Sequence, residues 1–166
     1  MCIRDSDPTV TNVNDAPTAS NSTITATEDT TYTFTASDFN YSDQDGDTLS
    51  SVTVSALSTS GSGTFSLNGV AISGSTTVTK AQIDSGLLIF SPSLNDNGSS
   101  YNTFTFTVND GTTNSASSYT MTIDVSAVND APVADNETNT ATEGTNLNAR
   151  NGGSDDVLVG DTDVEN

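Results

Sequence analysis

The chain has 166 residues, of which 22 are Asp or Glu and three are Lys or Arg, so its formal net charge is −19. A surface this negative repels nucleic acid and anionic membranes and attracts cations. The chain has no His and a single cysteine, Cys2, which argues against catalysis and zinc binding by those residue types.

Two segments of the sequence repeat at a spacing of 115 residues. Residues 13–17 read Val-Asn-Asp-Ala-Pro and return at 128–132, and residues 25–28 read Thr-Ala-Thr-Glu and return at 140–143. A fixed period of domain length indicates a tandem array of equivalent modules. We expect residues 7–13 to be the last strand of a preceding repeat, 14–128 a complete module, and 129–166 a joint with the truncated start of the next repeat.

Residues 1–6 have no counterpart in the repeat and resemble translated adapter sequence, so we expect them to be a non-native artefact outside the fold. Cys2 lies in this segment, and no redox compartment can be inferred from it. The chain is then expected to be a piece of a larger protein. No run of about 18 apolar residues is present, so no insertion into a membrane is expected.

Short segments in which apolar and polar residues alternate fill the module. Alternation with many Thr residues is typical of strands that bury one face. The predicted strands contain, in chain order, Ile24; Tyr32, Phe34 and Ala36; Val52, Val54 and Ala56; Phe65 and Leu67; Val70 and Ile72; residues 87–90; Phe104, Phe106 and Val108; and Tyr119, Met121, Ile123 and Val125.

Turn signals separate these strands. Asn68-Gly69 between two apolar alternations predicts a hairpin with a type I′ turn, and Asp110-Gly111 fits the same turn type. Glu28 and Asp29 are expected in the turn after the first strand. About seven short strands without a helix-length pattern predict an all-β fold, an Ig-like Greek-key β-sandwich.

One loop concentrates negative charge. Asp43, Asp45 and Asp47 place three carboxylates within five residues, and their mutual repulsion disfavours a compact loop without a counter-ion. Carboxylate oxygens beside a flexible glycine suit Ca²⁺, which accepts six to eight oxygen ligands. The pattern is not an EF-hand, because Gly46 is fourth in the loop and position twelve is Val54. A solvated acidic loop is the alternative interpretation.

Sandwich topology predicts that acids distant in sequence meet at the two ends of the module. The loops after the second and sixth strands of an Ig-like sandwich emerge at one end. We therefore expect Asp43, Asp45, Asp47 and Asp110 to converge there with Asp15, which lies in the joint formed by residues 14–17. At the opposite end we expect Glu28 and Asp130, to which residues 95–98 could add oxygens. In the next repeat, Asp163 and Glu165 align with Asp43 and Asp45 after a five-residue insertion.

Together, the joint, Glu28, the Asp-x-Asp-Gly-Asp loop and the Asp110-Gly111 turn resemble bacterial cadherin-like tandem repeats of large secreted adhesins, of the RTX or biofilm type, over residues 13–132. The resemblance implies an extracellular, non-catalytic module at the bacterial cell surface, with adjacent repeats as partners and Ca²⁺ at the joints. The implied ligands are Asp15, Asp43, Asp45, Asp47 and Asp110 at one junction, and Glu28, Asn129, Asp130, Asp163 and Glu165 at the other. The chain departs from animal cadherins in its shorter joint and in having no Trp for strand exchange.

Other interpretations remain open. The module could bind a polysaccharide or protein of the cell surface or matrix, or it could be a metal-free Ig-like spacer. Residues 152–161 resemble one turn of a calcium-binding β-roll, a fold that needs several stacked turns. Glycoside hydrolysis by paired carboxylates is not expected, because the acids lie on end loops and no aromatic-lined cleft is apparent. No phosphate-binding loop is present either, so we predict that the module is not an enzyme.

Overall fold

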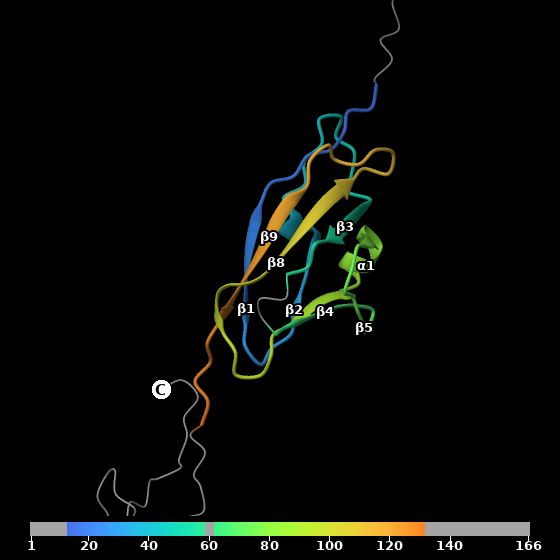
Figure 1. Ribbon diagram of the computed structural model, residues 1–166. Coiled ribbons are helices and arrows are strands. Elements are labelled where there is room, and N and C mark those ends of the chain that lie inside the picture. The colour runs from blue at the N-terminus through green and yellow to red at the C-terminus, as the bar shows by residue number, and fades with distance from the viewer. Residues whose placement is uncertain (1–12, 59–61, 132–166) are drawn as a thin grey trace, which may run out of the picture. The chain divides into compact units, whose positions relative to one another are not determined.

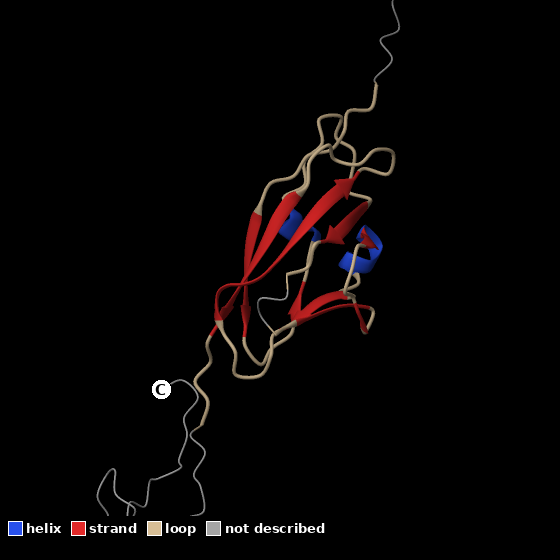
Figure 2. Cartoon of the chain, in the orientation of Figure 1, coloured by secondary structure: helices blue, strands red, loops and turns tan. Residues whose placement is uncertain are grey.

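The computed structural model describes residues 13–58 and 62–131. The chain divides into two compact units, Met1–Ser126 and Ala127–Asn166. The described part of the first unit consists of two β-sheets packed face to face, with two short helices (Figures 1 and 2). In the described part of the chain, no helix has the length and hydropathy needed to cross a membrane.

The larger sheet has five strands in the order β1–β9–β8–β3–β6. Its strands are β1 (Ser22–Thr27), β9 (Tyr119–Ser126), β8 (Gly98–Asn109), β3 (Ser51–Ser55) and β6 (Thr76–Thr79). The edge strand β1 runs parallel to β9, and the remaining neighbours are antiparallel. This parallel pair joins the first and last strands, which are about a hundred residues apart in sequence.

The smaller sheet has four antiparallel strands in the order β2–β7–β4–β5. These are β2 (Tyr32–Thr33), β7 (Leu88–Ser91), β4 (Thr64–Leu67) and β5 (Val70–Ala71). The helices are the 3₁₀ turn η1 (Ala36–Phe39) and the α-helix α1 (Lys80–Asp84). The predicted all-β, Ig-like sandwich is confirmed.

The inward positions of the alternating strands form one aromatic-rich core. Phe104 is 1% exposed, and its ring lies 5.8 Å from that of Phe34 and 5.4 Å from that of Phe65. Most predicted apolar positions of the strands are buried, including Ile24, Phe34, Val52, Val54, Phe65, Leu88, Phe90, Phe104, Phe106, Val108, Met121, Ile123 and Val125. Burying each such side chain contributes about 1.5–3 kcal/mol, and this apolar burial holds the two sheets together.

The predicted strand over Tyr32, Phe34 and Ala36 is wrong beyond Thr33. Phe34 is buried and its N–H bonds to the carbonyl of Leu88 at 3.0 Å, but Ala36 begins η1. Asp38 accepts a hydrogen bond from the backbone N–H of Thr35 at 2.8 Å, which stabilises the start of this turn. The local side-chain bond competes with strand pairing and ends the strand.

The helix α1 is a second difference from the predicted elements. Thr79 and Gln82 form a reciprocal capping box, in which the backbone N–H of each residue donates to the side chain of the other, at 2.9 and 3.3 Å. This Thr-x-x-Gln spacing is a known helix-start signal. A five-residue helix is too short to show apolar periodicity, so the alternation pattern does not predict it.

The Asn68-Gly69 turn provides a first testable prediction. The two residues have φ of 51° and 77°, as the predicted type I′ turn requires. A Cβ at Gly69 would meet no atom within 4 Å, so Gly69→Ala costs only the backbone strain of positive φ, about 1 kcal/mol of unfolding free energy. Urea denaturation measures this loss. Gly74→Ala is the matched control, because Gly74 has the same open surroundings without a positive φ, and equal losses in both variants would contradict the prediction.

Candidate metal site

The acidic loop after η1 folds around the side chain of Asp43. Its Oδ1 accepts hydrogen bonds from the backbone N–H groups of Asp45 at 2.8 Å and Asp47 at 3.0 Å. Gly46 takes a φ of 85°, which a glycine adopts without strain. As a result, one carboxylate oxygen each from Asp43, Asp45 and Asp47 lie within 4.8 Å of one another. The Oδ2 atom of Asp43 is buried and accepts no hydrogen bond.

The joint is hydrogen-bonded both to this loop and to the loop between β8 and β9. The backbone N–H of Asp15 donates to Oδ2 of Asp45 at 2.6 Å, and the side-chain amide of Asn14 donates to Oδ2 of Asp110 at 3.0 Å. Just beyond the joint, Thr18 and Ser42 pair through reciprocal backbone hydrogen bonds of 2.8 and 2.9 Å. These contacts bring together the chain entry, the acidic loop and the β8–β9 loop.

Asp110 belongs to a different turn from the one its sequence suggests. Only Gly111 has a positive φ, so Asp110-Gly111 is not a type I′ turn. Instead, Oδ1 of Asp110 accepts from the N–H groups of Thr112 and Thr113, both at 2.6 Å. The hydrogen bonds from Asn14, first, and then from the Thr113 backbone lower the pKa of Asp110 below its ordinary value of 3.8, so the carboxylate stays ionised.

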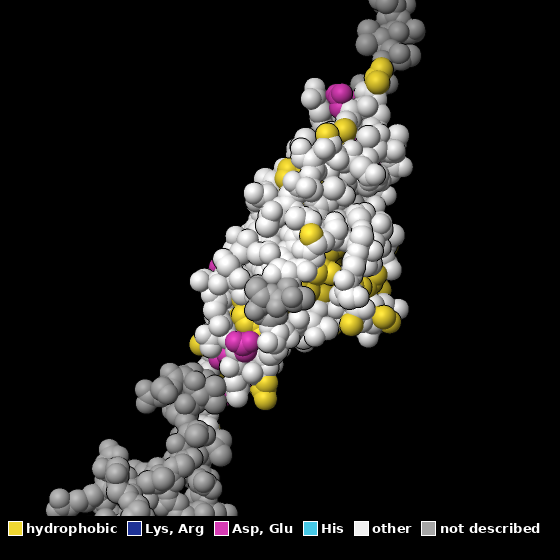
Figure 3. Space-filling view, in the orientation of Figure 1, with side chains coloured by type: hydrophobic (Ala, Val, Ile, Leu, Met, Phe, Trp, Pro, Cys, Tyr) yellow, Lys and Arg dark blue, Asp and Glu magenta, His cyan; other side chains and the backbone are white. Residues whose placement is uncertain are grey.

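Tyr41 lies near these acids, and both its burial and their charges affect its pKa. Its hydroxyl donates to the backbone carbonyl of Asp47 at 3.0 Å. Burial, followed by the negative charges of Asp43, Asp110 and Asp47, raises the pKa of Tyr41 to about 12. The acids expected at the N-terminal end therefore do lie around one end of the sandwich, although for Asp15 it is the backbone that contacts the loop. Figure 3 shows Asp and Glu side chains gathered near the two ends of the visible face.

At the opposite end, Glu28 is fully buried in the turn after β1. The side-chain amide of Asn97 donates to Oε2 of Glu28 at 3.1 Å, and the backbone N–H of Asn95 donates to Oδ1 of Asp29 at 3.1 Å. The 95–98 loop and the Glu28 turn thus meet. A buried carboxylate needs such a partner, because an isolated buried charge is costly.

The remaining predicted ligands belong to other parts of the chain. Asn129 and Asp130 lie in the second unit, where the side-chain amide of Asn129 donates to the carbonyl of Asp130 at 2.8 Å. Asn14 makes the equivalent bond to the carbonyl of Asp15 at 2.9 Å. The two copies of the joint thus share the same local hydrogen bond. Asp163, Glu165 and residues 152–161 lie outside the described residues.

Three residues at these ends were not among the predicted ligands. Asn14 binds Asp110, Asn97 binds Glu28, and Tyr41 supports Asp47. The signal for Asn14 was present, since its repeat equivalent, Asn129, was predicted to be a ligand. Asn97 lies in the 95–98 segment that was expected to add oxygens at this end, although it contacts Glu28 through its amide N–H. No sequence signal identified Tyr41, because its role depends on the fold of the loop itself.

Comparison with known proteins agrees with the architecture. No curated protein and no solved structure gave a match. A family model described as bacterial Ig domain matches residues 14–125, which is more than half of the chain and runs from the joint into β9. The chain therefore belongs to the bacterial Ig domain family.

Proposed function

We propose that this module is a calcium-dependent structural repeat, in which Ca²⁺ at the N-terminal end stiffens the joint to the preceding domain. One observation carries the proposal: Asp43, Asp45 and Asp47 gather their oxygens within 4.8 Å in a loop to which the joint is hydrogen-bonded. An ion bound there would hold the loop and the chain entry together. Bacterial Ig domains are generally non-catalytic and often lie at the cell surface or outside the cell, which supports a structural role.

The chemistry of the loop favours Ca²⁺ over other common ions. Every available ligand is a hard oxygen, and the loop carries no His or Cys. Asp43 already uses Oδ1 to hold the loop, which leaves Oδ2 buried and available. Extracellular modules bind Ca²⁺ with dissociation constants of roughly 10⁻⁴–10⁻³ M, so the site would fill outside the cell and empty inside it.

The junction with the next repeat would hold Ca²⁺ in the same way. Glu28 of this module, Asn129 and Asp130 of the joint, and Asp163 and Glu165 of the next repeat would supply the oxygens. Repeated along an array, such joints would convert a flexible chain into a rod suited to a secreted adhesin. We propose the adhesin role as well. The surface that binds the adhesion target would lie on other domains or on this module.

A tandem chain with one complete junction tests the proposal. Because the sequence repeats at residue 128, a chain in which residues 7–128 are followed directly by residues 14–131 joins two copies through an unaltered joint. We expect small-angle X-ray scattering to give a longer maximum dimension and a narrower distance distribution in millimolar Ca²⁺ than in EDTA. Mg²⁺, which demands a stricter octahedral geometry, is the matched control ion.

Two results would contradict the proposal. Identical scattering in Ca²⁺ and EDTA, together with no heat of calcium binding by calorimetry, would identify a metal-free spacer. Calcium binding without a change in dimensions would show that the ion does not stiffen the joint. A single module is a poor substitute in this experiment, because each junction draws ligands from two domains.

A further inference from the structure

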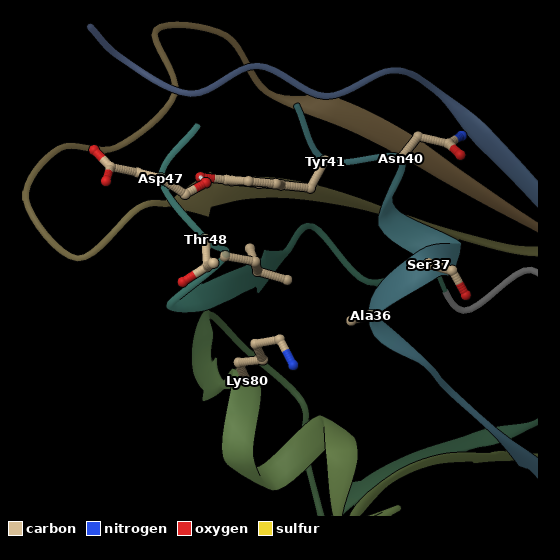
Figure 4. A pocket seen from close by; sticks show the side chains of 8 residues that line it. Ala36, Ser37, Asn40, Tyr41, Asp47, Thr48 and Lys80 are labelled. Carbon is tan, nitrogen blue, oxygen red and sulfur yellow. Dashed lines mark hydrogen bonds between the residues drawn. The ribbon is translucent and has the colours of Figure 1, made fainter. Parts of the chain in front are cut away.

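A shallow hollow lies beside the acidic loop, between η1 and α1. Its volume is about 440 Å³, which lies within the range of small-molecule sites. Tyr41, Leu49, Ala36, Thr48 and Lys80 are among the residues that line it. Figure 4 shows the Tyr41 ring edge-on, on the opposite side of the hollow from Lys80, so that one ring face is turned toward the space between them. Tyr41 is the one aromatic residue among those that line the hollow.

The lining is apolar at its base and polar at its rim. Leu49 is buried, Ala36 and Tyr41 are half-buried, and Thr48 is exposed at the edge. The side chains of Ser37, Asn40 and Asp47 point away from the hollow (Figure 4), so they do not make its interior polar. A complementary ligand therefore presents a flat apolar face to the Tyr41 ring and hydrogen-bonding groups to the rim.

Charge restricts the ligand further. Lys80 is the only basic residue in the described ranges, and its ammonium group is bound to Asp84 at 2.5 Å. The acids of the neighbouring loop repel an anionic ligand, and pairing with Asp84 leaves the Lys80 ammonium little net charge with which to attract one. A neutral ligand with an apolar face and a polar edge fits this lining and avoids that repulsion.

We propose that this hollow binds a neutral pyranose unit of a glycan. The C–H face of the sugar ring packs on Tyr41, above Ala36 and Leu49, and its hydroxyl groups meet Thr48 and Lys80 at the rim. The Tyr41 hydroxyl is already bound to the carbonyl of Asp47, which holds the ring in place before the ligand arrives. The site requires no bound cation, so it is independent of the calcium proposal.

Nuclear magnetic resonance on the full chain tests this assignment. The ¹⁵N-labelled chain is titrated, in EDTA, with glucose, galactose, mannose and N-acetylglucosamine, and with glucuronate as the anionic counterpart of glucose. We expect at least one neutral sugar to shift the amide signals of residues 36–41, 47–49 and 80. Glucuronate is expected to bind more weakly than glucose, because it carries its charge toward the acidic loop.

Variants distinguish a role of the Tyr41 ring in sugar binding from a general loss of stability. Tyr41→Leu is expected to weaken sugar binding by at least about tenfold, whereas Tyr41→Phe keeps the ring face and loses only the hydroxyl bond to Asp47, so it should weaken sugar binding much less. Tyr32→Leu is the matched control. Tyr32 is also a half-buried tyrosine, its hydroxyl donates to the carboxylate of Asp38, and it lies outside the hollow. Ala36→Leu, which fills the hollow without touching the tyrosine, provides a second test if Tyr41→Leu does not fold.

Several outcomes would overturn the assignment. These are the absence of shifts at the hollow with every neutral sugar, equal weakening by Tyr32→Leu and Tyr41→Leu, and tighter binding of glucuronate than of glucose. Failure of all sugars together with binding of the apolar dye ANS would instead identify a docking site for an apolar protein segment. Because the titration is performed in EDTA, none of these results depends on whether Ca²⁺ binds the acidic loop.

Discussion

Asp43→Asn in the second copy of the tandem chain is expected to weaken calcium binding at the junction by more than about tenfold, or about 1.4 kcal/mol. The substitution keeps a side-chain oxygen that can accept from the N–H groups of Asp45 and Asp47, so the loop can keep its fold. What it removes is one negative charge and the buried Oδ2. Because affinity for Ca²⁺ increases with the number of charged ligands, we expect the substitution to weaken calcium binding and not to unfold the loop. Isothermal titration calorimetry measures it.

The tandem chain supplies its own control for this experiment. Asp43→Asn in the first copy removes the same charge from a loop that has no preceding domain, so it should leave the junction affinity unchanged. Scattering in Ca²⁺ should then show the extended chain for the first-copy variant and the EDTA-like distribution for the second-copy variant. Equal affinities for the two variants would place the ion elsewhere and contradict the proposed site.

Phe104→Ala is expected to lower the unfolding free energy by about 3–5 kcal/mol, the largest stability effect of any substitution considered for this module. The ring is 1% exposed and packs against the rings of Phe65 in the smaller sheet, Phe106 in the larger sheet, and Phe34 just after β2. Its removal leaves a cavity between the sheets that the strands cannot close without breaking their pairing. Urea denaturation followed by circular dichroism measures the loss.

The adjacent outward residue gives the matched control for the core. Thr103→Ala changes the neighbouring position of the same strand on the half-exposed face, and we expect a loss within about 0.5 kcal/mol. Should the two variants differ by less than about 1 kcal/mol, Phe104 would not be the contact that joins the sheets. The experiment needs no ion, so it tests the fold separately from the function.

Much of the fold could be predicted from the sequence because strands reveal their buried face directly. The side chains of a strand alternate between two faces, so the alternation alone assigns Phe104, Phe106 and Val108 to the core, where all three are buried. The Asn68-Gly69 turn was predictable for a similar reason, since positive φ at two adjacent residues restricts the residue types. The 115-residue repeat likewise depends on sequence identity alone.

Local hydrogen bonds limited the prediction elsewhere. Asp38 ends β2 by binding the N–H of Thr35, and the reciprocal bonds of Thr79 and Gln82 start α1. Asp110 folds its turn by accepting from two threonine N–H groups instead of adopting a positive φ. In each case one polar side chain binds nearby backbone, and its energy is comparable to the small differences between strand, helix and turn.

The sequence by itself determined the composition of the candidate site: the acidic loop, the repeated joint and the excess of negative charge are all legible in it. Only the tertiary structure decided which groups meet, because a hydrogen bond between Asn14 and Asp110, 96 residues apart, depends on the path of every strand between them. The hollow beside Tyr41 likewise exists only because η1 and α1, from separate segments, border the same space. The sequence determines the chemical type of each residue, whereas the distance between remote residues depends on how the sandwich packs.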